Sequence, residues 1–485
     1  MNRANPDELV HLLGRWASGR GPLYLLLAAR LRALVDDGVL PPGERLPPDR
    51  VLADRLAVGR GTVVAAYELL QQEGRVTRRQ GSGTRVAPGD PPATRTADGV
   101  AANPLMLNLL HDSDGVRLLT CAAPDDPPPA LFEAYQEAGA RVAGLRDLGY
   151  HPAGDPALRE ALAAYYAARG LPTTADQIMV TTGAQQALTL LAGLLVAPGD
   201  TVLTEAPTYP GALEVFRHAA AVVKPVNLSD DLGDLGDGQA RRAVRERPAL
   251  VYSVPTARNP DGAVMDDRGR RRLAALAAAH DVPLIDDEVC AELCFSGGTP
   301  APVAAFGGGE RVVTVGSLSK LVWGGLRVGW IRAAAPLVSR LARLRAVHDL
   351  GGEVFSQLAA VALLRRLDEV REARVRALRR RHDHLCAELR ARLPSWTFEP
   401  AQGGQTVWVR LPRGDAGSFA QVALRHGVAV PPGGSFDPLG GHAAHLRLHF
   451  LFPEEELSRA VCDLAAAWAA YDGAGKPVSR HALVV

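Results

Sequence analysis

Apolar and polar residues near the start of the chain recur with helical spacing, and short turns interrupt them. Leu25–Val35 keeps apolar residues on one helical face and ends at Asp36–Gly38. A second helix is predicted over Val51–Leu56, with Asp49 able to cap it, and a third over Arg60–Glu73. Two short helices joined by a tight turn are typical of modules that place the second helix in the DNA major groove.

The third predicted helix has an apolar face and an exposed, polar beginning. Its inward positions are Val63, Ala66, Tyr67 and Leu70, and Arg60, Gly61 and Thr62 open its N-terminus. The following stretch, residues 75–86 (RVTRRQGSGTRV), predicts a basic β-hairpin with a glycine-rich tip. We interpret helices and hairpin together as a winged helix-turn-helix.

After residue 104 the pattern changes to short apolar runs that alternate with amphipathic segments. The runs predict strands at 178–181, 200–204, 249–253, 283–286 and 311–315, with helices such as 186–196 and 268–280 between them. This alternation indicates an α/β body with a mainly parallel, doubly wound sheet, which binds ligands beyond the carboxyl ends of its strands.

These patterns divide the chain into four parts. We expect a winged helix-turn-helix domain at 1–87, a proline-containing linker at 88–104, the α/β body at 105–472 with a smaller C-terminal subdomain from about residue 340 onward, and a loose tail at 473–485.

Charge and cysteine content narrow the class of protein. The whole chain has a net charge of +1, but residues 15–86 hold twelve arginines and seven acids, a local net charge of +5 that suits binding to DNA phosphates. The five cysteines form no C-x-x-C pair, so we expect no disulfide framework, no metal site and a reducing cytoplasm. No apolar run reaches the roughly 18 residues that a membrane span needs, so no membrane partner is expected.

Lys320 is the most informative residue of the body. Of 54 basic residues only three are lysines, at positions 224, 320 and 476. A lysine amine can lose its proton and attack an aldehyde, whereas arginine stays protonated and cannot form an imine. Lys320 follows the predicted strand at 311–315 in the segment Thr314–Lys320.

Polar residues follow the neighbouring strands in the same way. Gly183, Ala184 and Gln185 open a helix that suits a phosphate, and Ser317, Ser319 and Arg327 add further phosphate-binding groups. Candidates for contacts with a heterocycle are Tyr209 for stacking, Asn259 for a phenolate oxygen and Asp287 for a protonated ring nitrogen. Each residue alone has a commoner structural explanation, but their shared position after strands favours one ligand site.

In this order of motifs the body resembles the fold-type I aminotransferases. Tyr150–Arg159, Gln402–Gly404 with Trp408, and His445–Leu448 match further stretches of that family. The resemblance implies pyridoxal 5'-phosphate (PLP) held by Lys320 as a Schiff base and Asp287 on its ring nitrogen. It also implies that Tyr150 reaches the cofactor of a partner subunit, hence a homodimer, and that Arg447 binds a substrate or effector carboxylate.

The N-terminal part resembles the GntR regulators. Leu46-Pro47, Arg60–Val63 and Gly81–Thr84 carry much of this similarity. The resemblance implies that the following residues contact double-stranded DNA: Arg50, Arg60, Thr62, Arg78, Arg79 and Gly81. Asp49 and Gly59 stand where that family usually has serine, and an acid at position 49 can repel a nearby phosphate.

The body departs from its family at Cys290, where tyrosine usually donates to the 3′ oxygen of the cofactor, and at Trp323 and Gly324 after the lysine. A thiol is a poor hydrogen-bond donor, which puts efficient transamination in doubt. Asp286 competes with Asp287 for the ring-nitrogen role, because an offset of one residue is open from sequence.

A GntR-type winged helix joined to an aminotransferase-like body resembles the MocR regulators from end to end. The resemblance implies a PLP-dependent transcriptional regulator that senses an amine or amino acid by imine exchange at Lys320, with the linker transmitting the change to the DNA-binding domain. Two alternatives stay open. One is an active aminotransferase of a small amino acid with an appended DNA-binding module, and the other is a regulator whose body has lost PLP and only dimerises.

Overall fold

The computed structural model describes residues 6–14, 16–17, 22–72, 75–79, 83–87, 115–228, 245–296 and 298–471. The predicted linker at 88–104 and tail at 473–485 lie outside the described residues. None of the described helices is long and apolar enough to cross a membrane.

The N-terminal module contains the helices and the hairpin that the hydrophobic pattern predicts. Its elements are α1 (Pro6–Leu13), α2 (Leu23–Asp36), α3 (Asp49–Leu56), α4 (Arg60–Gln72), β1 (Val76–Arg79) and β2 (Gly83–Val86), with the two strands paired antiparallel. The four predicted inward positions of α4 are fully buried in the core of the module. Helix α1, which the sequence analysis did not anticipate, adds Leu9 and Leu13 to that core.

The start of α3 differs from the expectation. Pro48 takes the N-cap position and Asp49 is the first helical residue, so the Asp49 side chain does not cap the helix. Its carboxylate accepts a hydrogen bond from Arg60 instead. Helix α3 ends at Ala57, whose left-handed backbone (φ 50°) turns the chain toward α4.

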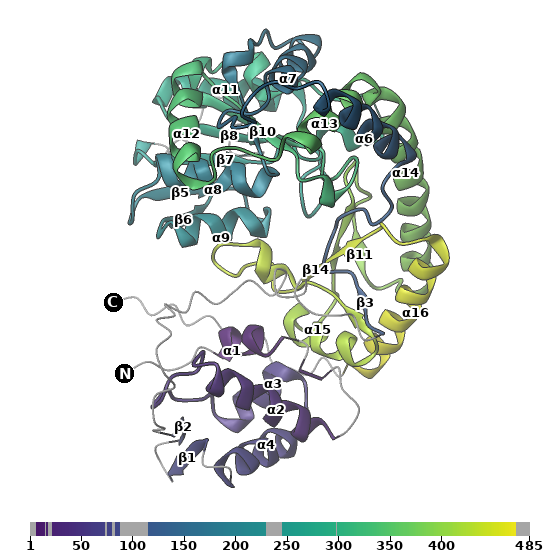
Figure 1. The fold of residues 1–485 in the computed structure, drawn as a ribbon. Helices are drawn as coiled ribbons and strands as arrows, with labels where there is room; N and C mark the ends of the chain where they lie inside the picture. The colour runs from purple at the N-terminus through teal and green to yellow at the C-terminus, as the bar shows by residue number, and fades with distance from the viewer. Residues whose placement is uncertain are drawn as a thin grey trace.

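A seven-stranded sheet forms the centre of the body (Figure 1). Its order is β4 (Ile178–Thr181), β10 (Gly329–Arg332), β9 (Val312–Ser317), β8 (Leu284–Asp287), β7 (Leu250–Ser253), β5 (Thr201–Thr204) and β6 (Val222–Pro225). All neighbours pair in parallel except β10, which runs antiparallel to both β4 and β9. Five of the strands are buried along their whole length, as expected for a sheet that is covered on both faces: β4, β7, β8, β9 and β10.

Helices cover both faces of this sheet. The apolar cluster on one face includes residues of α8 (Ala184–Leu195), α9 (Pro210–His218) and α12 (Ala335–His348), and the cluster on the other includes α11 (Asp267–His280). Helices α6 (Pro129–Val142), α7 (Pro156–Ala168) and α13 (Val354–Arg365) complete this part of the body.

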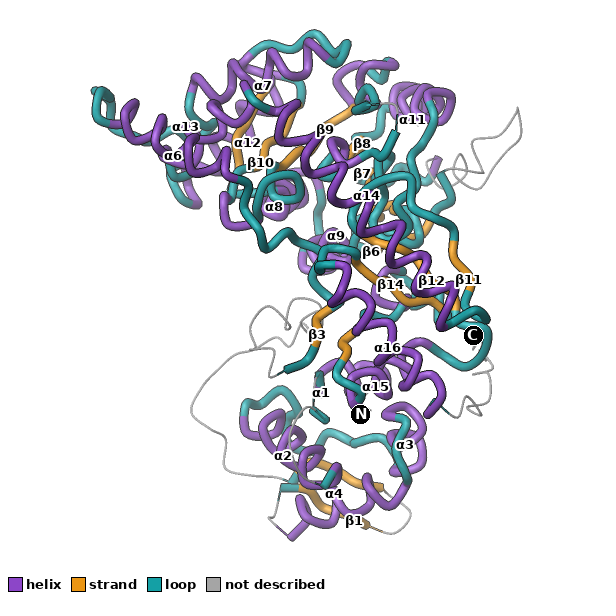
Figure 2. Tube along the Cα trace, turned by 90° about the vertical axis from the view of Figure 1, so that its right-hand side faces the viewer, coloured by secondary structure: helices purple, strands orange, loops and turns teal. Residues whose placement is uncertain are grey.

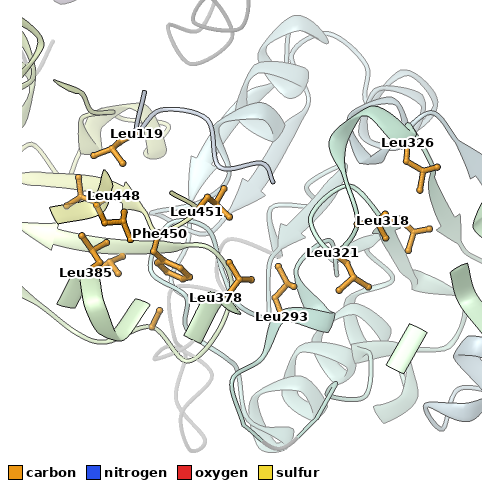
Figure 3. Packing of buried hydrophobic residues seen from close by; sticks show 14 of the residues in the cluster. Leu119, Leu293, Leu318, Leu321, Leu326, Leu378, Leu385, Leu448, Phe450 and Leu451 are labelled. Carbon is orange, nitrogen blue, oxygen red and sulfur yellow. The ribbon is translucent and has the colours of Figure 1, made fainter. Parts of the chain in front are cut away.

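A smaller antiparallel sheet lies between the large sheet and the N-terminal module (Figure 1). It contains β11 (Thr397–Phe398), β12 (Thr406–Arg410) and β14 (His445–His449), with α14 (Leu367–Arg392), α15 (Ala416–Arg425) and α16 (Glu454–Ala470) around it. One apolar cluster runs without a break from Leu448 and Phe450 of this part to Leu318 and Leu326 beside the large sheet (Figure 3). The two parts of the body therefore share one core.

Two short strands join distant parts of the sequence. Strand β3 (Arg117–Leu118) pairs in parallel with β13 (Val428–Ala429), which directly follows α15. The pairing extends one residue further, because the amide of Leu119 donates to the carbonyl of Ala429 at 2.9 Å. Residues 117–122 thus run from the neighbourhood of α15 toward the large sheet.

The N-terminal module contacts the body through α15 (Figures 1 and 2). Arg425 donates from Nη1 to the carbonyl of Leu56 at 3.2 Å and from Nη2 to that of Ala57 at 2.8 Å, at the end of α3. Trp16 adds a hydrogen bond of 3.1 Å from Nε1 to Oε1 of Gln421. The body is therefore tied to α3, the helix that precedes α4.

Candidate cofactor site and DNA-binding surface

Lys320 lies three residues beyond the end of β9, on the edge of the sheet where the parallel strands end. Its Nζ donates to the carbonyl of Ala122 at 2.5 Å, and its charge interacts with Cys290, Asp287 and Arg447. Burial lowers the pKa of the Lys320 amine below its usual range. A larger fraction of neutral amine, the form that attacks a carbonyl, follows from this shift.

Asp287 is the acid that faces Lys320. Its carboxylate is buried, accepts a hydrogen bond from the hydroxyl of Tyr252 at 2.6 Å and interacts with the charge of Lys320. Burial raises the pKa of the Asp287 carboxyl, although the bond from Tyr252 opposes that shift. A buried carboxylate in this position is best stabilised by a cationic partner.

Asp286 points to the other face of the sheet. Its Oδ2 accepts a hydrogen bond from the amide of Val303 at 2.9 Å, and within the described part of the chain its Oδ1 has no partner. Its carboxyl interacts with Arg270 and Glu288, and burial raises its pKa to about 8. Of the two candidate acids, only Asp287 therefore adjoins the lysine.

The N-terminus of α8 and the loop after Lys320 form a cradle for an anion. Gly183 has φ 89° and precedes α8, and a Cβ at this position would lie 3.0 Å from Nη2 of Arg327. The guanidinium of Arg327 donates to the carbonyl of Thr182. Exposed helix amides and a guanidinium in one place suit a phosphate group.

Ser317 and Ser319 lie next to this loop. Their hydroxyl groups are 2.7 Å apart, and that of Ser317 also donates to the carbonyl of Val328 at 3.0 Å. Ala184 and Gln185 form the first turn of α8, and Oε1 of Gln185 accepts a hydrogen bond from Tyr209 at 3.1 Å. The predicted phosphate-binding residues therefore meet at one end of the sheet.

Arg447 is a buried cation that has no acidic partner among the described residues. Its Nη2 donates to the carbonyl of Thr120 and its Nη1 to Oδ1 of Asn259 at 3.4 Å, while Nε has no partner among the described residues. Its guanidinium carbon lies 5.2 Å from the centre of the Phe436 ring. Burial lowers the pKa of this guanidinium to about 10, and within the described part of the chain no salt bridge joins it to a carboxylate.

Two residues near the lysine, Tyr252 and Cys121, were missed by sequence reasoning. Tyr252 lies inside an apolar strand, where nothing distinguishes a hydrogen-bonding tyrosine from a core residue. Cys121 reaches the site through the segment 117–122, and its partner β13 is about 310 residues away in the sequence. Cys290, which the sequence analysis discussed, interacts with the charge of Lys320, and burial raises the pKa of its thiol to about 12, so the thiol stays protonated.

Tyr150 is set apart from these residues. Its side chain is 66% exposed, in the loop between α6 and α7. Exposed apolar side chains occur in the same loop and on nearby elements: Leu148, Phe132, Val347 and Leu350.

Within the described residues, no group of three or more His, Cys, Asp or Glu side chains could hold a metal ion.

Of the predicted DNA-contacting residues, Arg50 lies on α3, Arg60 and Thr62 lie on α4, and Arg78 lies on β1. Arg50 and Arg60 are exposed and Thr62 is half-buried. Arg78 lies 6.0 Å from the centre of the Tyr67 ring, which connects the wing to α4. Arg79 ends β1, but its side chain and Gly81 lie outside the described residues.

Family models match both parts of the chain. The model of the bacterial regulatory proteins of the gntR family matches residues 23–86, and the model of aminotransferase class I and II matches residues 114–464. Together they cover both regions in which the sequence predicts a domain.

The chain is similar to transcriptional regulators and to aminotransferases. The HTH-type transcriptional regulator YdcR of Escherichia coli K12 is 30% identical over 433 residues, which cover 85% of this chain and 92% of YdcR. The probable rhizopine catabolism regulatory protein MocR of Rhizobium meliloti is 32% identical over 335 residues, or 64% of this chain and 65% of MocR. Among solved structures, the α-aminoadipate aminotransferase LysN of Thermus thermophilus matches 76% of this chain and 94% of its own, with 27% identity and a TM-score of 0.66.

Proposed function

This chain belongs to the aminotransferase class I and II family and carries a GntR DNA-binding domain, the arrangement of the MocR-like transcriptional regulators, and we propose that its body is a PLP-dependent sensor of an amino acid. Proteins with this fold typically depend on PLP. In this proposal Lys320 would hold the cofactor, whose aldehyde would also combine with the amine of the effector, and the resulting shift would change how the DNA-binding domain meets its operator.

The side chains around Lys320 fit the cofactor. PLP supplies an aldehyde that combines reversibly with primary amines and a ring that accepts electrons. Lys320 would hold it through its neutral amine, and Asp287 would pair with the protonated ring nitrogen. That pairing would give the buried Asp287 carboxylate a cationic partner in addition to the charge of Lys320.

The remaining contacts divide between phosphate and ring. The phosphate would be bound by the amides of Gly183 and Ala184, the hydroxyl groups of Ser317 and Ser319, and the guanidinium of Arg327. Tyr209 would stack on the ring, and its hydroxyl donates a hydrogen bond to Gln185, which orients it. Asn259 would donate to the 3′ oxygen of the cofactor.

The environment of Arg447 is the observation that supports an amino acid as the effector. A buried guanidinium without an acidic partner is costly, and a carboxylate from a bound molecule would relieve that cost. Because Arg447 also interacts with Lys320, a molecule whose amine and carboxylate are attached to the same carbon can satisfy both residues. The effector proposed is therefore an α-amino acid rather than a simple amine.

A matched set of ligands tests this assignment. L-amino acids and the amines that lack only their carboxylate would be titrated against the PLP-loaded protein while its visible absorption is followed. Loss of a buried charge partner costs about 2 kcal/mol or more, so we expect the best amino acid to bind at least about 30-fold more tightly than its amine. Arg447→Ala should abolish this preference, and Arg410→Ala, at an exposed position of the same sheet, should keep it. Equal binding of both ligands by the parent protein would refute the proposal.

An active aminotransferase is the second candidate. The lowered pKa of Lys320 favours it, since the released amine could carry a proton during turnover. Cys290 opposes it, because a protonated thiol is a weak donor to the 3′ oxygen of the cofactor. Conversion of an added 2-oxo acid into its amino acid over many cycles would favour the enzyme.

We also propose a homodimer. Leu148 is 88% exposed and Val347 is 84% exposed. The backbone of His151 packs closely against Gly351, so the loop between α6 and α7 adjoins the loop that follows α12. A second copy of this chain would cover these apolar side chains and bring its Tyr150 to the site. Two DNA-binding domains would then meet two half-sites of an operator.

The contact between α15 and α3 offers a route for the signal. Arg447 and Lys320 both donate to carbonyls of residues 120–122, and the same segment pairs with β13 next to α15. Ligand binding at these side chains would release those carbonyls and shift the segment. In this proposal α15 complements the linker, to which the sequence analysis assigned the whole coupling.

A further inference from the structure

The exposed guanidinium of Arg60 is held by an acid on the neighbouring helix. Nε of Arg60, the first residue of α4, donates to Oδ2 of Asp49, the first residue of α3, at 2.8 Å. The side chain of Asp49 is 18% exposed and that of Arg60 is 55% exposed. The bond to Arg60 is the main cause of the lowered pKa of Asp49, which keeps the carboxylate charged.

The contact uses only one edge of the guanidinium. Among the described residues Arg60 has no other hydrogen-bond partner, so Nη1 and Nη2 are left at the exposed end of the side chain. These two nitrogens form a planar fork whose spacing matches O6 and N7 of guanine in the major groove. An arginine held in this way loses less side-chain freedom when it meets a base than an unrestrained one.

The carboxylate also acts on DNA directly. Phosphates repel a negative charge near the groove, so Asp49 weakens contacts that do not depend on sequence. Binding to the correct base would gain from the ordered fork, whereas binding to random sequence would only lose. The two effects together raise discrimination rather than affinity.

We propose that Asp49 is a positioning residue that makes Arg60 a reader of one guanine in the operator. This inference rests on the proposed DNA binding and names the base that this part of the site recognises. An exposed ion pair without a function is the alternative, since such pairs commonly contribute little.

Selection from a pool of random duplexes tests the proposal. The full-length, PLP-loaded protein would first be used to enrich a preferred sequence. Each position of that sequence would then be substituted, and binding would be measured for the parent, Asp49→Asn, Arg60→Ala and the double variant. We expect Asp49→Asn to lower the preference for one guanine by about tenfold, or about 1.4 kcal/mol, and to bind a random duplex as tightly as the parent or more tightly.

The other variants locate the effect. Arg60→Ala should lose preference at the same base pair, and the double variant should be no worse than Arg60→Ala alone. Asp54→Asn removes the same charge from an exposed position of α3 without touching Arg60, and it should keep the preference. Thermal unfolding of each variant checks that the fold is intact.

Three results would overturn the inference. An unchanged pattern of base preference in Asp49→Asn would show that the pair has no role in recognition. Equal tightening of binding to all sequences would show that the acid only repels phosphates. If the parent enriches no sequence at all, the proposed DNA-binding function falls as well, and the two failures are thereby distinguished.

Discussion

Replacing Arg425 by alanine should detach the DNA-binding domain from the body. The guanidinium makes two hydrogen bonds to the last carbonyls of α3, at 2.8 and 3.2 Å. These carbonyls form the negative end of the helix dipole, which favours a cation. Burial lowers the pKa of Arg425, so the contact is already partly removed from water.

The size of the effect follows from these bonds. A hydrogen bond to a charged group contributes about 1.5 kcal/mol at the lower end of its range, so two contribute about 3 kcal/mol. The side chain is only half-buried, and competition from water reduces this to about 2 kcal/mol. The equilibrium between the docked and detached domain should therefore shift by about 30-fold.

Hydrogen exchange read by mass spectrometry measures this shift in the full-length protein. Amides of residues 49–57 should exchange up to about 30-fold faster in Arg425→Ala, because the domain is detached for a larger fraction of the time. Arg459→Ala, which removes an exposed arginine paired with Glu455 on α16, should leave these amides unchanged. The variant should still bind DNA, but amino acids should alter its affinity less than that of the parent, because only the linker then couples the two parts. Exchange at 49–57 equal to that of the parent would refute the reasoning.

Two further changes have defined outcomes. Leu148→Glu places a charge on an exposed apolar surface and should convert the proposed dimer into a monomer, while the far-UV circular dichroism is unchanged; sedimentation that still shows a dimer would exclude this surface. Burial raises the pKa of the Asp286 carboxyl from 3.8 in the unfolded chain to about 8 in the native state. Between these two pH values the native state holds a proton that the unfolded chain has lost, so the free energy of unfolding of the parent falls by about 1.4 kcal/mol for each unit by which the pH rises. The Asp286→Asn variant has no such carboxyl, so its Tm should rise relative to the Tm of the parent as the pH is raised from about 5 to about 8. A Tm difference that does not vary with pH would contradict the assignment.

Much of the fold follows from hydrophobic periodicity. The predicted strand at 178–181 coincides with β4, and the other four lie within a residue or two of β5, β7, β8 and β9, because each is an apolar run buried on both faces. The inward face of α4 was predicted for the same reason. Local pattern is sufficient where burial alone selects the residues.

Features that depend on distant contacts were beyond the sequence. Asp49 is as suitable an N-cap as it is an ion-pair partner, and only the approach of α4 decides between these roles. The pairing of β3 with β13 joins segments about 310 residues apart and leaves no periodic signal. Of the two adjacent acids, the pleat of β8 turns Asp287 toward Lys320 and Asp286 away, which depends on the register of the sheet.

The visible absorption spectrum of the purified protein, recorded beside that of Lys320→Ala, tests the central claim most directly. The account predicts a band of lysine-bound PLP in the parent that the variant lacks or shifts, and that responds to an amino acid. A parent protein without such a band, even after PLP is added, would contradict it, and the body would then serve the DNA-binding domain without sensing through a cofactor.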